Sequence, residues 1–284
     1  MRARYAEELR ERLSLRNKRL VEALATVPRE DFLGPGPWLV LRVPEGYTST
    51  PDADPRQLYA DVAVGLVPGQ LLNNGAPSLV AVLIDALDVE AGSHVVHVGP
   101  ATGYYSAILA EVVGPTGRVT AIELVPELAD RARRSLARWK HVEVVTGDGT
   151  RHRTAPADVI LVTAGCTHPK QVWLDGLLPG GRLLVPLTGL RPPPPAARFG
   201  RNLAGQALLV RRGGDTWPAR FVIGMGISFC HGARDLVHER LLQQSFAKGA
   251  ARNVRSLIRT PHPGEQTCWL HADDFCLSTR EPRD

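Results

Sequence analysis

Three short segments of the chain carry residue types that could bind a nucleoside. The apolar run His94–Gly99 (HVVHVG) leads into Gly99-Pro-Ala-Thr-Gly103, the run Arg118–Glu123 (RVTAIE) ends in an acid, and a third run is followed by Gly147-Asp148-Gly149. Glycine lets a backbone approach a ligand closely, and a helix that begins after such a turn offers unpaired N–H groups. The three segments together predict a cofactor site.

The spacing favours a nucleoside over a dinucleotide. Glu123 follows Gly99 by 24 residues, and an acid at that point can accept both hydroxyls of a ribose. Asp148 can accept an amino hydrogen from a base. Both Glu123 and Asp148 are expected to be exposed carboxylates at loop ends. The turn lacks the central glycine of GxGxxG that a pyrophosphate needs, so S-adenosyl-L-methionine is the favoured ligand. The alternative for the glycine turn alone is a tight turn in an ordinary α/β protein.

Ligands of parallel sheets bind at the carboxyl ends of the strands, where these segments are expected to lie. The candidate cofactor-binding residues are therefore Val98, Gly99, Pro100, Ala101, Thr102, Gly103, Tyr104, Glu123, Leu124, Gly147, Asp148, Gly149 and Thr163.

Strand and helix patterns alternate through the middle of the chain and would position this site. Helices are predicted at 77–87, 104–113, 126–138 and 169–178, and strands at 94–99, 118–123, 142–146, 157–163, 182–186, 205–211 and 219–228. Such alternation predicts an α/β fold, a doubly wound and mostly parallel sheet with helices on both faces. Unbroken apolar strands are typical of such a buried sheet.

The flanking segments have other patterns. The first segment, residues 1–33, is predicted to be helical, with the helix ending at Pro28. Residues 34–58 are predicted to form a long surface connection, and Pro192–Pro195 a loop or polyproline segment. We expect three parts: an N-terminal helical segment with substrate-side loops (1–75), the S-adenosylmethionine-binding domain (76–228) and a C-terminal extension (229–284).

The composition of the 284-residue chain, 44% hydrophobic and 22% charged, excludes a disordered or collagen-like protein. No stretch approaches the ~20 apolar residues of a membrane span. The charged N-terminus has no apolar signal region, so no membrane partner and a cytoplasmic location are expected. Residues 189–284 hold 14 basic and 8 acidic side chains, a charge that could attract nucleic acid or belong to a solvated surface.

The motifs give the chain a resemblance to the protein-L-isoaspartate O-methyltransferases, which use S-adenosylmethionine. It covers residues 20–188 and rests on VPREDFL (27–33), Tyr59-Ala-Asp61, APSLVAVLIDAL (76–87), HVVHVGPATGYYSAILAEVVGPTGRVTAIEL (94–124), TGDG (146–149), ADVILVTAG (157–165) and LLPGGRLLVPL (177–187). The resemblance implies a Rossmann-like class I fold with seven strands. It also implies a cofactor pocket lined by Gly99, Ala101, Gly103, Glu123 and Asp148.

The chain departs from the family pattern on the substrate side. His97 replaces an acid in the first strand, the glycine turn contains a proline and an alanine, and Gly75 stands where the family has a serine that contacts the substrate carboxylate. An apparent two-residue insertion would bring Asn73 or Asn74 to the place of that serine. Asn73, Asn74 and Gly75 are therefore the candidate catalytic residues. The alternative role is a turn, since these residue types tolerate positive φ.

The extension contains residue types that bind metals. Cys230, His231, Cys268, His271 and Cys276 are possible ligands, but their spacing matches no zinc motif and free cysteine commonly packs as a small apolar residue. No metal is predicted. The aromatic and aliphatic residues expected in the core of the extension are Trp269, Phe275 and Leu277. The arginines that could guide a peptide carboxylate are Arg252, Arg255 and Arg259.

Three functions are compatible with these patterns. The first is an O-methyltransferase acting on an aspartyl or isoaspartyl carboxylate of a protein or ribosomally made peptide. The second is a nucleic-acid methyltransferase, although no aromatic site for an amino group of a base is apparent. The third is a degenerate methyltransferase fold used as a binding module. The sequence leaves the oligomeric state open.

Overall fold

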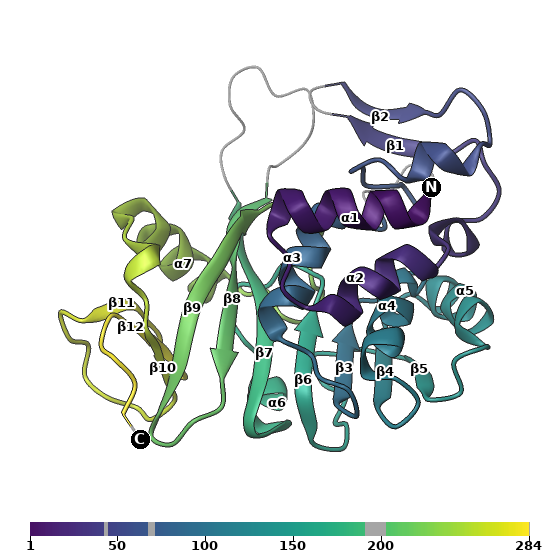
Figure 1. The fold of residues 1–284 in the computed structure, drawn as a ribbon. Coiled ribbons are helices and arrows are strands. Elements are labelled where there is room, and N and C mark those ends of the chain that lie inside the picture. Colours follow the sequence, from purple (N-terminus) through teal and green to yellow (C-terminus); the bar gives the residue numbers. More distant parts are fainter. Residues whose placement is uncertain (43–44, 68–71, 191–202, 284) are drawn as a thin grey trace. The chain divides into compact units, whose positions relative to one another are not determined.

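The computed structural model describes all residues except 43–44, 68–71, 191–202 and 284, so Leu71 and the proline run at 192–195 lie outside the described residues. Figure 1 shows the order of the helices and strands. The chain divides into two compact units, Met1–Gly149 and Thr150–Asp284. Within the described residues, no helix is long and apolar enough to cross a bilayer.

The first unit begins with two helices, where one was predicted. α1 (Arg2–Leu13) ends at Ser14, which adopts a left-handed conformation, and α2 (Lys18–Thr26) starts from an Asn17 cap. The Asp85 carboxylate accepts the backbone N–H groups of Arg16 and Asn17, both at 2.8 Å. Both helices bury leucines at helical spacing, so the sequence pattern does not reveal the break between them. The Asn17 cap and the distant Asp85 decide where the chain turns.

Residues 34–58 form regular structure, and the prediction of a surface connection was wrong. Strands β1 (Leu39–Arg42) and β2 (Gly46–Ser49) pair antiparallel, between short 3-10 helices η1 (Arg29–Phe32) and η2 (Pro55–Leu58). Side chains from this segment and the next make a core of their own, which includes Trp38, Val40, Leu58, Val64 and Leu66. Burial of those apolar side chains outweighs the local Gly and Pro content.

The parallel sheet of the first unit agrees closely with the predicted elements. Strands β3 (His94–Val98), β4 (Arg118–Glu123) and β5 (Val142–Thr146) pair in that order, all parallel. Helix α3 (Pro77–Leu87) precedes β3, and helices α4 (Tyr104–Val113) and α5 (Pro126–Leu136) connect the three strands. The loops after β3, β4 and β5 therefore lie at one edge, and they carry the predicted cofactor residues.

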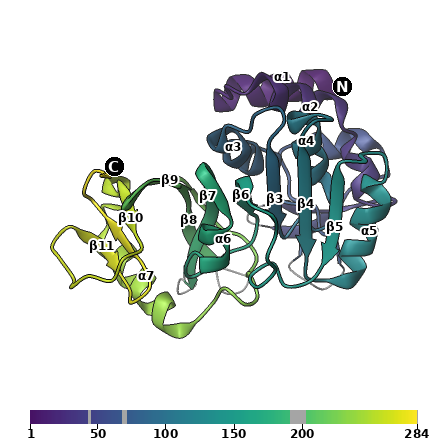
Figure 2. The ribbon, with the colours of Figure 1, turned by 90° about the horizontal axis from the view of Figure 1, so that it is seen from below.

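The second unit continues with a parallel pair and then an antiparallel series (Figure 2). β6 (Ala157–Val162) pairs parallel with β7 (Leu177–Leu190), and α6 (Gln171–Asp175) connects them. β7, β8 (Leu203–Arg211) and β9 (Thr216–Met225) pair antiparallel. Thus β3–β9 are the seven strands that the resemblance implies.

The extension adds strands to the edge of β9. After α7 (Leu236–Lys248) and η3 (Ala251–Asn253), β10 (Ser256–Ile258) pairs with β9, and β12 (Cys276–Ser278) and β11 (Cys268–His271) follow outward. The sequence analysis did not predict β10, which is only three residues long. Trp269, Phe275 and Leu277 are buried, as predicted.

His97, in the middle of β3, gives the fold a dependence on pH. Its ring is buried, Nδ1 lies 2.8 Å from Ser106 Oγ, and burial lowers its pKa to about 3. The unfolded chain has a His pKa near 6.5, so only the unfolded state takes up this proton as pH falls from 6.5 toward 3. We expect protonation of His97 in the unfolded state to lower the free energy of unfolding by about 1.6 kcal/mol between pH 6.5 and pH 5.

Urea unfolding at several pH values measures this effect. His97→Gln should flatten the pH dependence by about that amount, whereas His152→Gln, at an exposed histidine, should leave it unchanged. An unaltered pH slope in folded His97→Gln would contradict the assignment.

Candidate active site

The turn after β3 has backbone φ angles that residues with a side chain rarely adopt. Gly99, Ala101 and Gly103 all have positive φ, at 80°, 53° and 94°. The Gly103 N–H donates to the carbonyl of Pro100 at 2.9 Å and α4 starts immediately afterwards. Two of the three positions are glycine because that residue has no Cβ to clash, and Ala101 holds the same conformation at a cost.

Glu123, at the end of β4, holds this turn. Its Oε2 accepts the N–H of Ala101 at 2.8 Å, and its Oε1 accepts the N–H of Val125 at 3.0 Å. The expectation of an exposed carboxylate is wrong, because Glu123 is only 6% exposed. Burial raises its pKa, and the backbone N–H groups of Val125, Ala101 and Leu124 act in the opposite direction. A carboxylate can accept about four hydrogen bonds and three backbone N–H groups are bound here, so capacity for one ribose hydroxyl remains.

The glycines of the site serve different purposes. A Cβ at Gly103 would lie 2.8 Å from Leu136 of α5, and one at Gly149 would lie 2.6 Å from Val98. These two are small because protein packs against them, which corrects our expectation that Gly103 makes room for the ligand. A Cβ at Gly147 would meet nothing within 4 Å. Open space therefore lies over the turn that carries Asp148.

Leu124 gives the same edge an apolar surface. It is 43% exposed, one of the few large apolar side chains that face solvent among the described residues. An exposed leucine lies beside the open space at Gly147, near a carboxylate with remaining acceptor capacity. Together they suit a nucleoside, whose flat base can pack on the leucine while a ribose hydroxyl bonds to the carboxylate. The residues present therefore fit S-adenosylmethionine.

The other predicted cofactor residues fall into two groups. Val98, Thr102 and Tyr104 are buried, and the Tyr104 ring packs against Phe32 and Tyr105 with centroids 5.6 and 4.9 Å away. These side chains lie inside the protein, and their contact with a cofactor stays a prediction. Thr163 follows β6 in the second unit, so its role stays a prediction, as does that of half-buried Asp148.

Ala101 provides a direct test of the turn geometry. Ala101→Gly should leave the free energy of unfolding unchanged or raise it by up to about 1 kcal/mol, because glycine relieves the left-handed strain but gains freedom in the unfolded chain. Ala101→Val should lower it by at least about 1 kcal/mol, since a branched side chain fits this conformation poorly. Chemical denaturation measures both, with Ala129→Gly within α5 as the control that should lose about 1 kcal/mol. A destabilised Ala101→Gly would refute the strain argument.

On the substrate side, Asn73, Asn74 and Gly75 form a turn. Asn73 Oδ1 accepts the Gly75 N–H at 2.8 Å, and its Nδ2 donates to the Tyr47 hydroxyl at 3.0 Å. Gly75 has φ +68°, and the Tyr105 hydroxyl donates to its carbonyl at 3.3 Å. Asn74 is buried. The turn predicted as the alternative role is thus present, and a catalytic role for these residues stays a prediction.

Arg29 anchors this turn from inside the first unit, and sequence reasoning missed it. Its side chain is 0% exposed. Its Nε donates to Asn74 Oδ1 at 3.2 Å and its NH2 to the Gly75 carbonyl at 3.1 Å. The carbonyls of Leu58 and Val62 accept further bonds, both at 2.8 Å. The cation joins four segments, and its place inside VPREDFL was the only signal in the sequence.

A polar cluster at the start of α7 was also missed. The ring nitrogens of His238 lie 2.6 Å from Asp235 Oδ2 and 3.0 Å from Asp274 Oδ1. The His168 ring stacks on His238 with centroids 4.2 Å apart, and burial, followed by the nearby His238, lowers the pKa of His168 to about 4. Asp235 also caps α7 through the His238 N–H at 2.8 Å. The cluster fixes the first turn of α7.

The arginines of the extension are engaged within the second unit. Arg259 bonds Gln171 Oε1 at 3.0 Å, pairs with Asp175 and lies over the Trp217 ring. Arg255 donates to the carbonyl of Arg252 at 2.7 Å and lies 3.6 Å from Glu281. The role predicted for these arginines in guiding a substrate therefore rests on no contact seen here and stays a prediction.

This combination of sheet, turn and acids defines a class I S-adenosylmethionine-dependent methyltransferase. Two solved structures share the fold. One is a protein-L-isoaspartate O-methyltransferase, with TM-score 0.65, 22% identity, and coverage of 87% of this chain and 70% of that one. The other is a putative protein-L-isoaspartate O-methyltransferase from Plasmodium falciparum in complex with S-adenosyl-L-homocysteine, with TM-score 0.59, 16% identity, and coverage of 81% and 97%.

Sequence comparison gives the family. The protein-L-isoaspartate(D-aspartate) O-methyltransferase family model matches residues 2–193. Protein-L-isoaspartate O-methyltransferase 2 of Archaeoglobus fulgidus is 36% identical over 190 residues, which are 66% of this chain and 78% of that protein. The Methanopyrus kandleri enzyme is 36% identical over 191 residues, 66% and 76% of the two chains. The chain belongs to the protein-L-isoaspartate(D-aspartate) O-methyltransferase family.

Proposed function

We propose that this chain transfers the methyl group of S-adenosylmethionine to an aspartyl or isoaspartyl carboxylate in a protein or ribosomally made peptide. The observation that carries the proposal is the Glu123-braced turn beside the open space at Gly147, in a chain of this family. When bound, S-adenosylmethionine supplies an electrophilic methyl group on a positively charged sulfur.

The chain's own residues would chiefly position the reactants. The substrate carboxylate is already an anion, so the reaction needs no strong base, and catalysis depends on orientation and on exclusion of water. Glu123 holds the backbone of the cofactor turn, and Arg29 holds the turn on the substrate side. Both act on geometry, without taking a proton.

Asn73 is the better of the two candidate carboxylate donors. The amide nitrogen of Asn73 has two hydrogens, and its hydrogen bond to the Tyr47 hydroxyl uses one of them. The amide of Asn74 is buried and its oxygen is held by Arg29. A single donor from Asn73 could orient one carboxylate oxygen of the substrate while the other attacks.

Transfer of a labelled methyl group to synthetic peptides tests the activity. An isoaspartyl peptide and its aspartyl twin are compared, together with a pool of transfer RNA. Base-stable label in RNA alone would overturn the proposal in favour of a nucleic-acid enzyme. Absence of transfer to any peptide or protein extract, with S-adenosylmethionine still bound in calorimetry, would favour a binding module.

Asn73→Asp tests the assignment of the donor. The new side chain keeps the oxygen that accepts the Gly75 N–H but replaces the amide donor with a negative charge. We expect kcat/KM to fall by about 10²–10³, as for loss of one positioned donor, with unchanged affinity for S-adenosylmethionine. Asn73→Ser, which retains a donor, should keep part of the activity. Full activity of Asn73→Asp would refute the assignment.

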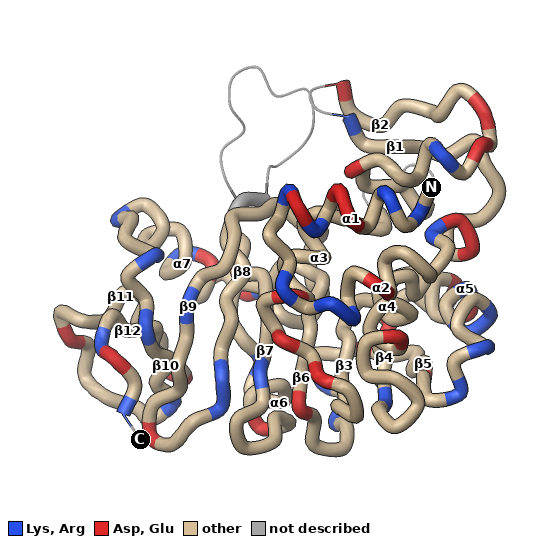
Figure 3. Tube along the Cα trace, viewed as in Figure 1, with Lys and Arg blue, Asp and Glu red and all other residues tan. Residues whose placement is uncertain are grey.

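The charge of the second unit supports a protein or peptide partner over nucleic acid. Basic residues are spread over several elements and lie among acids (Figure 3). Arg234, Arg255, Arg259 and Arg280 each pair with a carboxylate, so they offer less attraction to phosphates than their number implies. We also propose a cytoplasmic location for the protein. Residues 1–75, 76–228 and 229–284 are proposed as its functional parts.

A further inference from the structure

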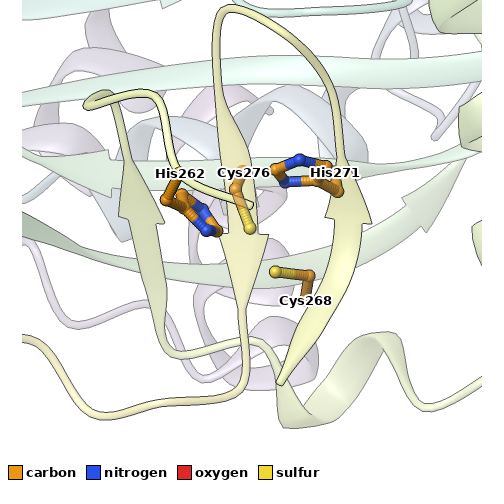
Figure 4. A group of neighbouring side chains, drawn as sticks. All are labelled: His262, Cys268, His271 and Cys276. Atoms are coloured by element: carbon orange, nitrogen blue, oxygen red, sulfur yellow. The ribbon is translucent and has the colours of Figure 1, made fainter. Parts of the chain in front are cut away.

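The outer strands of the extension bring four metal-binding side chains together. His262 comes from the loop before β11, Cys268 and His271 from the two ends of β11, and Cys276 from β12. One ligand atom of each lies within 4.8 Å of the others, and the side chains point toward one another (Figure 4). We propose that these four residues bind a structural zinc ion.

The histidines present their nitrogens as ligands would. His262 Nδ1 lies 2.8 Å from the Pro263 carbonyl, which places the ring hydrogen on Nδ1 and leaves a lone pair on Nε2. His262 Nε2 and His271 Nδ1 are both buried and have no hydrogen-bond partner among the described residues. Two such nitrogens beside two sulfurs are costly unless a cation fills the space between them.

The cysteines are also suited to the role. Neither Cys268 nor Cys276 is in a disulfide. The Glu265 N–H donates to Cys268 Sγ at 3.3 Å, a bond that stabilises a thiolate and fixes the direction of its sulfur. Two thiolates and two neutral imidazoles would balance the charge of a divalent cation, so the site can be buried without residual charge.

The set of ligands selects zinc. Two sulfurs and two nitrogens in a tetrahedron are the usual structural zinc site, with bonds of about 2.3 Å to sulfur and about 2.0–2.1 Å to nitrogen. Such bonds separate neighbouring ligand atoms by roughly 3.3–3.8 Å. Atoms now within 4.8 Å of one another need to move inward by only about 1 Å. Four protein ligands leave no open position for a substrate, so the ion would be structural.

The position of the site explains why a metal is useful there. β10, β11 and β12 are three or four residues long, and strands this short add little stability by pairing alone. A zinc ion would tie the loop before β11 to both outer strands. The site also lies beyond the family match at residues 2–193, so it belongs to the extension and does not depend on the methyltransferase chemistry.

The sequence analysis predicted no metal because it grouped the wrong residues. It considered Cys230 and His231 with Cys268, His271 and Cys276, and it omitted His262. The hairpin of β11 and β12 places His271 opposite Cys276, and a bulge between Cys268 and Leu270 changes the strand register beside Cys268. The loop before β11 places His262 beside these residues, and the spacing of the residues in the sequence does not reveal that proximity.

Metal analysis of the full-length chain tests the proposal. Protein expressed with zinc and purified without chelator should contain about one zinc ion per chain. Exchange for Co²⁺ should give a thiolate-to-cobalt charge-transfer band and the visible bands of tetrahedral cobalt. Chelation should lower the melting temperature.

Variants identify the ligands. His262→Ala and Cys276→Ser should lose stoichiometric zinc and the cobalt spectrum, and chelator should no longer shift the melting temperature of His262→Ala. His262→Cys replaces one zinc ligand by another and should retain the ion. Cys230→Ser and His231→Ala are the matched controls and should bind as the natural chain does. Because His262 lies in a loop, its variants remain informative even if Cys276→Ser fails to fold.

Three results would overturn the proposal. The first is that the natural chain binds zinc and cobalt no more strongly than the His262→Ala variant does. The second is retention of stoichiometric zinc by both His262→Ala and Cys276→Ser. The third is a Cys268–Cys276 disulfide in protein purified under reducing conditions, detected by mass spectrometry of a non-reduced digest.

Discussion

Replacement of Arg29 by methionine is expected to lower the free energy of unfolding by about 3–5 kcal/mol, the range for breaking a buried charged network. Methionine fills a similar volume but donates no hydrogen bond. The carbonyls of Leu58 and Val62 and the amide oxygen of Asn74 would lose the donor that Arg29 provides, and the Gly75 carbonyl would keep only the Tyr105 hydroxyl. Each buried acceptor left without a partner costs about 1–3 kcal/mol, less where water enters.

The same variant should lose methyl transfer even at temperatures where it is folded, because Arg29 fixes the turn that carries Asn73. Arg29→Lys keeps the charge but cannot reach four acceptors from one planar group, so an intermediate loss is expected. Arg16→Met is the matched control. That arginine is exposed and lies 3.6 Å from Asp85, a surface pair worth about 0–1 kcal/mol. Urea titration measures all three, and Arg29→Met as stable as Arg16→Met would contradict the argument.

The sequence predicted the parallel core well because its signals are local. β4, β5 and α4 have the bounds that apolar runs, flanking glycines and helical periodicity indicate. The helix break at Ser14 and the hairpin of β1 and β2 were missed, since both depend on partners elsewhere in the chain. Asp85 lies about 70 residues from the Asn17 cap that it supports.

The same distinction applies to the candidate site. The turn and its acids were found from residue type and spacing, and the Asn73–Gly75 segment from the family resemblance. Their physical roles were not, because burial is invisible in a linear pattern. Glu123 was expected to face solvent and instead braces the turn, and Gly103 was expected to face the ligand and instead packs on Leu136. His262 joins its cluster only through the fold of the β10–β11 loop.

Glu123→Ala is expected to weaken S-adenosylmethionine binding by about 10- to 150-fold, the equivalent of one hydrogen bond to a charged group worth about 1.5–3 kcal/mol. It should also destabilise the fold, unlike the purely local effect that an exposed carboxylate would have. The N–H groups of Ala101 and Val125 would lose their acceptor, at a cost of about 1–3 kcal/mol each before rehydration. Ala101 would then relax from its left-handed conformation.

Three variants separate bracing of the turn from contact with the cofactor. Glu123→Gln keeps one acceptor oxygen but turns an amide hydrogen toward the other N–H, so stability and affinity should both fall by less than in Glu123→Ala. Asp148→Ala should weaken binding with a smaller change in stability, because Asp148 is half-buried on a loop. Glu143→Ala, at an exposed carboxylate in β5, should change neither.

Calorimetric titration of S-adenosylmethionine and urea unfolding of each variant give the two quantities. If Glu123 braces the turn, the loss of affinity and the loss of stability rise together from Glu123→Gln to Glu123→Ala. If it only contacts the ribose, affinity falls in both variants while the unfolding free energy stays constant. Undiminished affinity in Glu123→Ala would remove Glu123 from the cofactor site, because the turn would then keep its shape without the carboxylate that holds it.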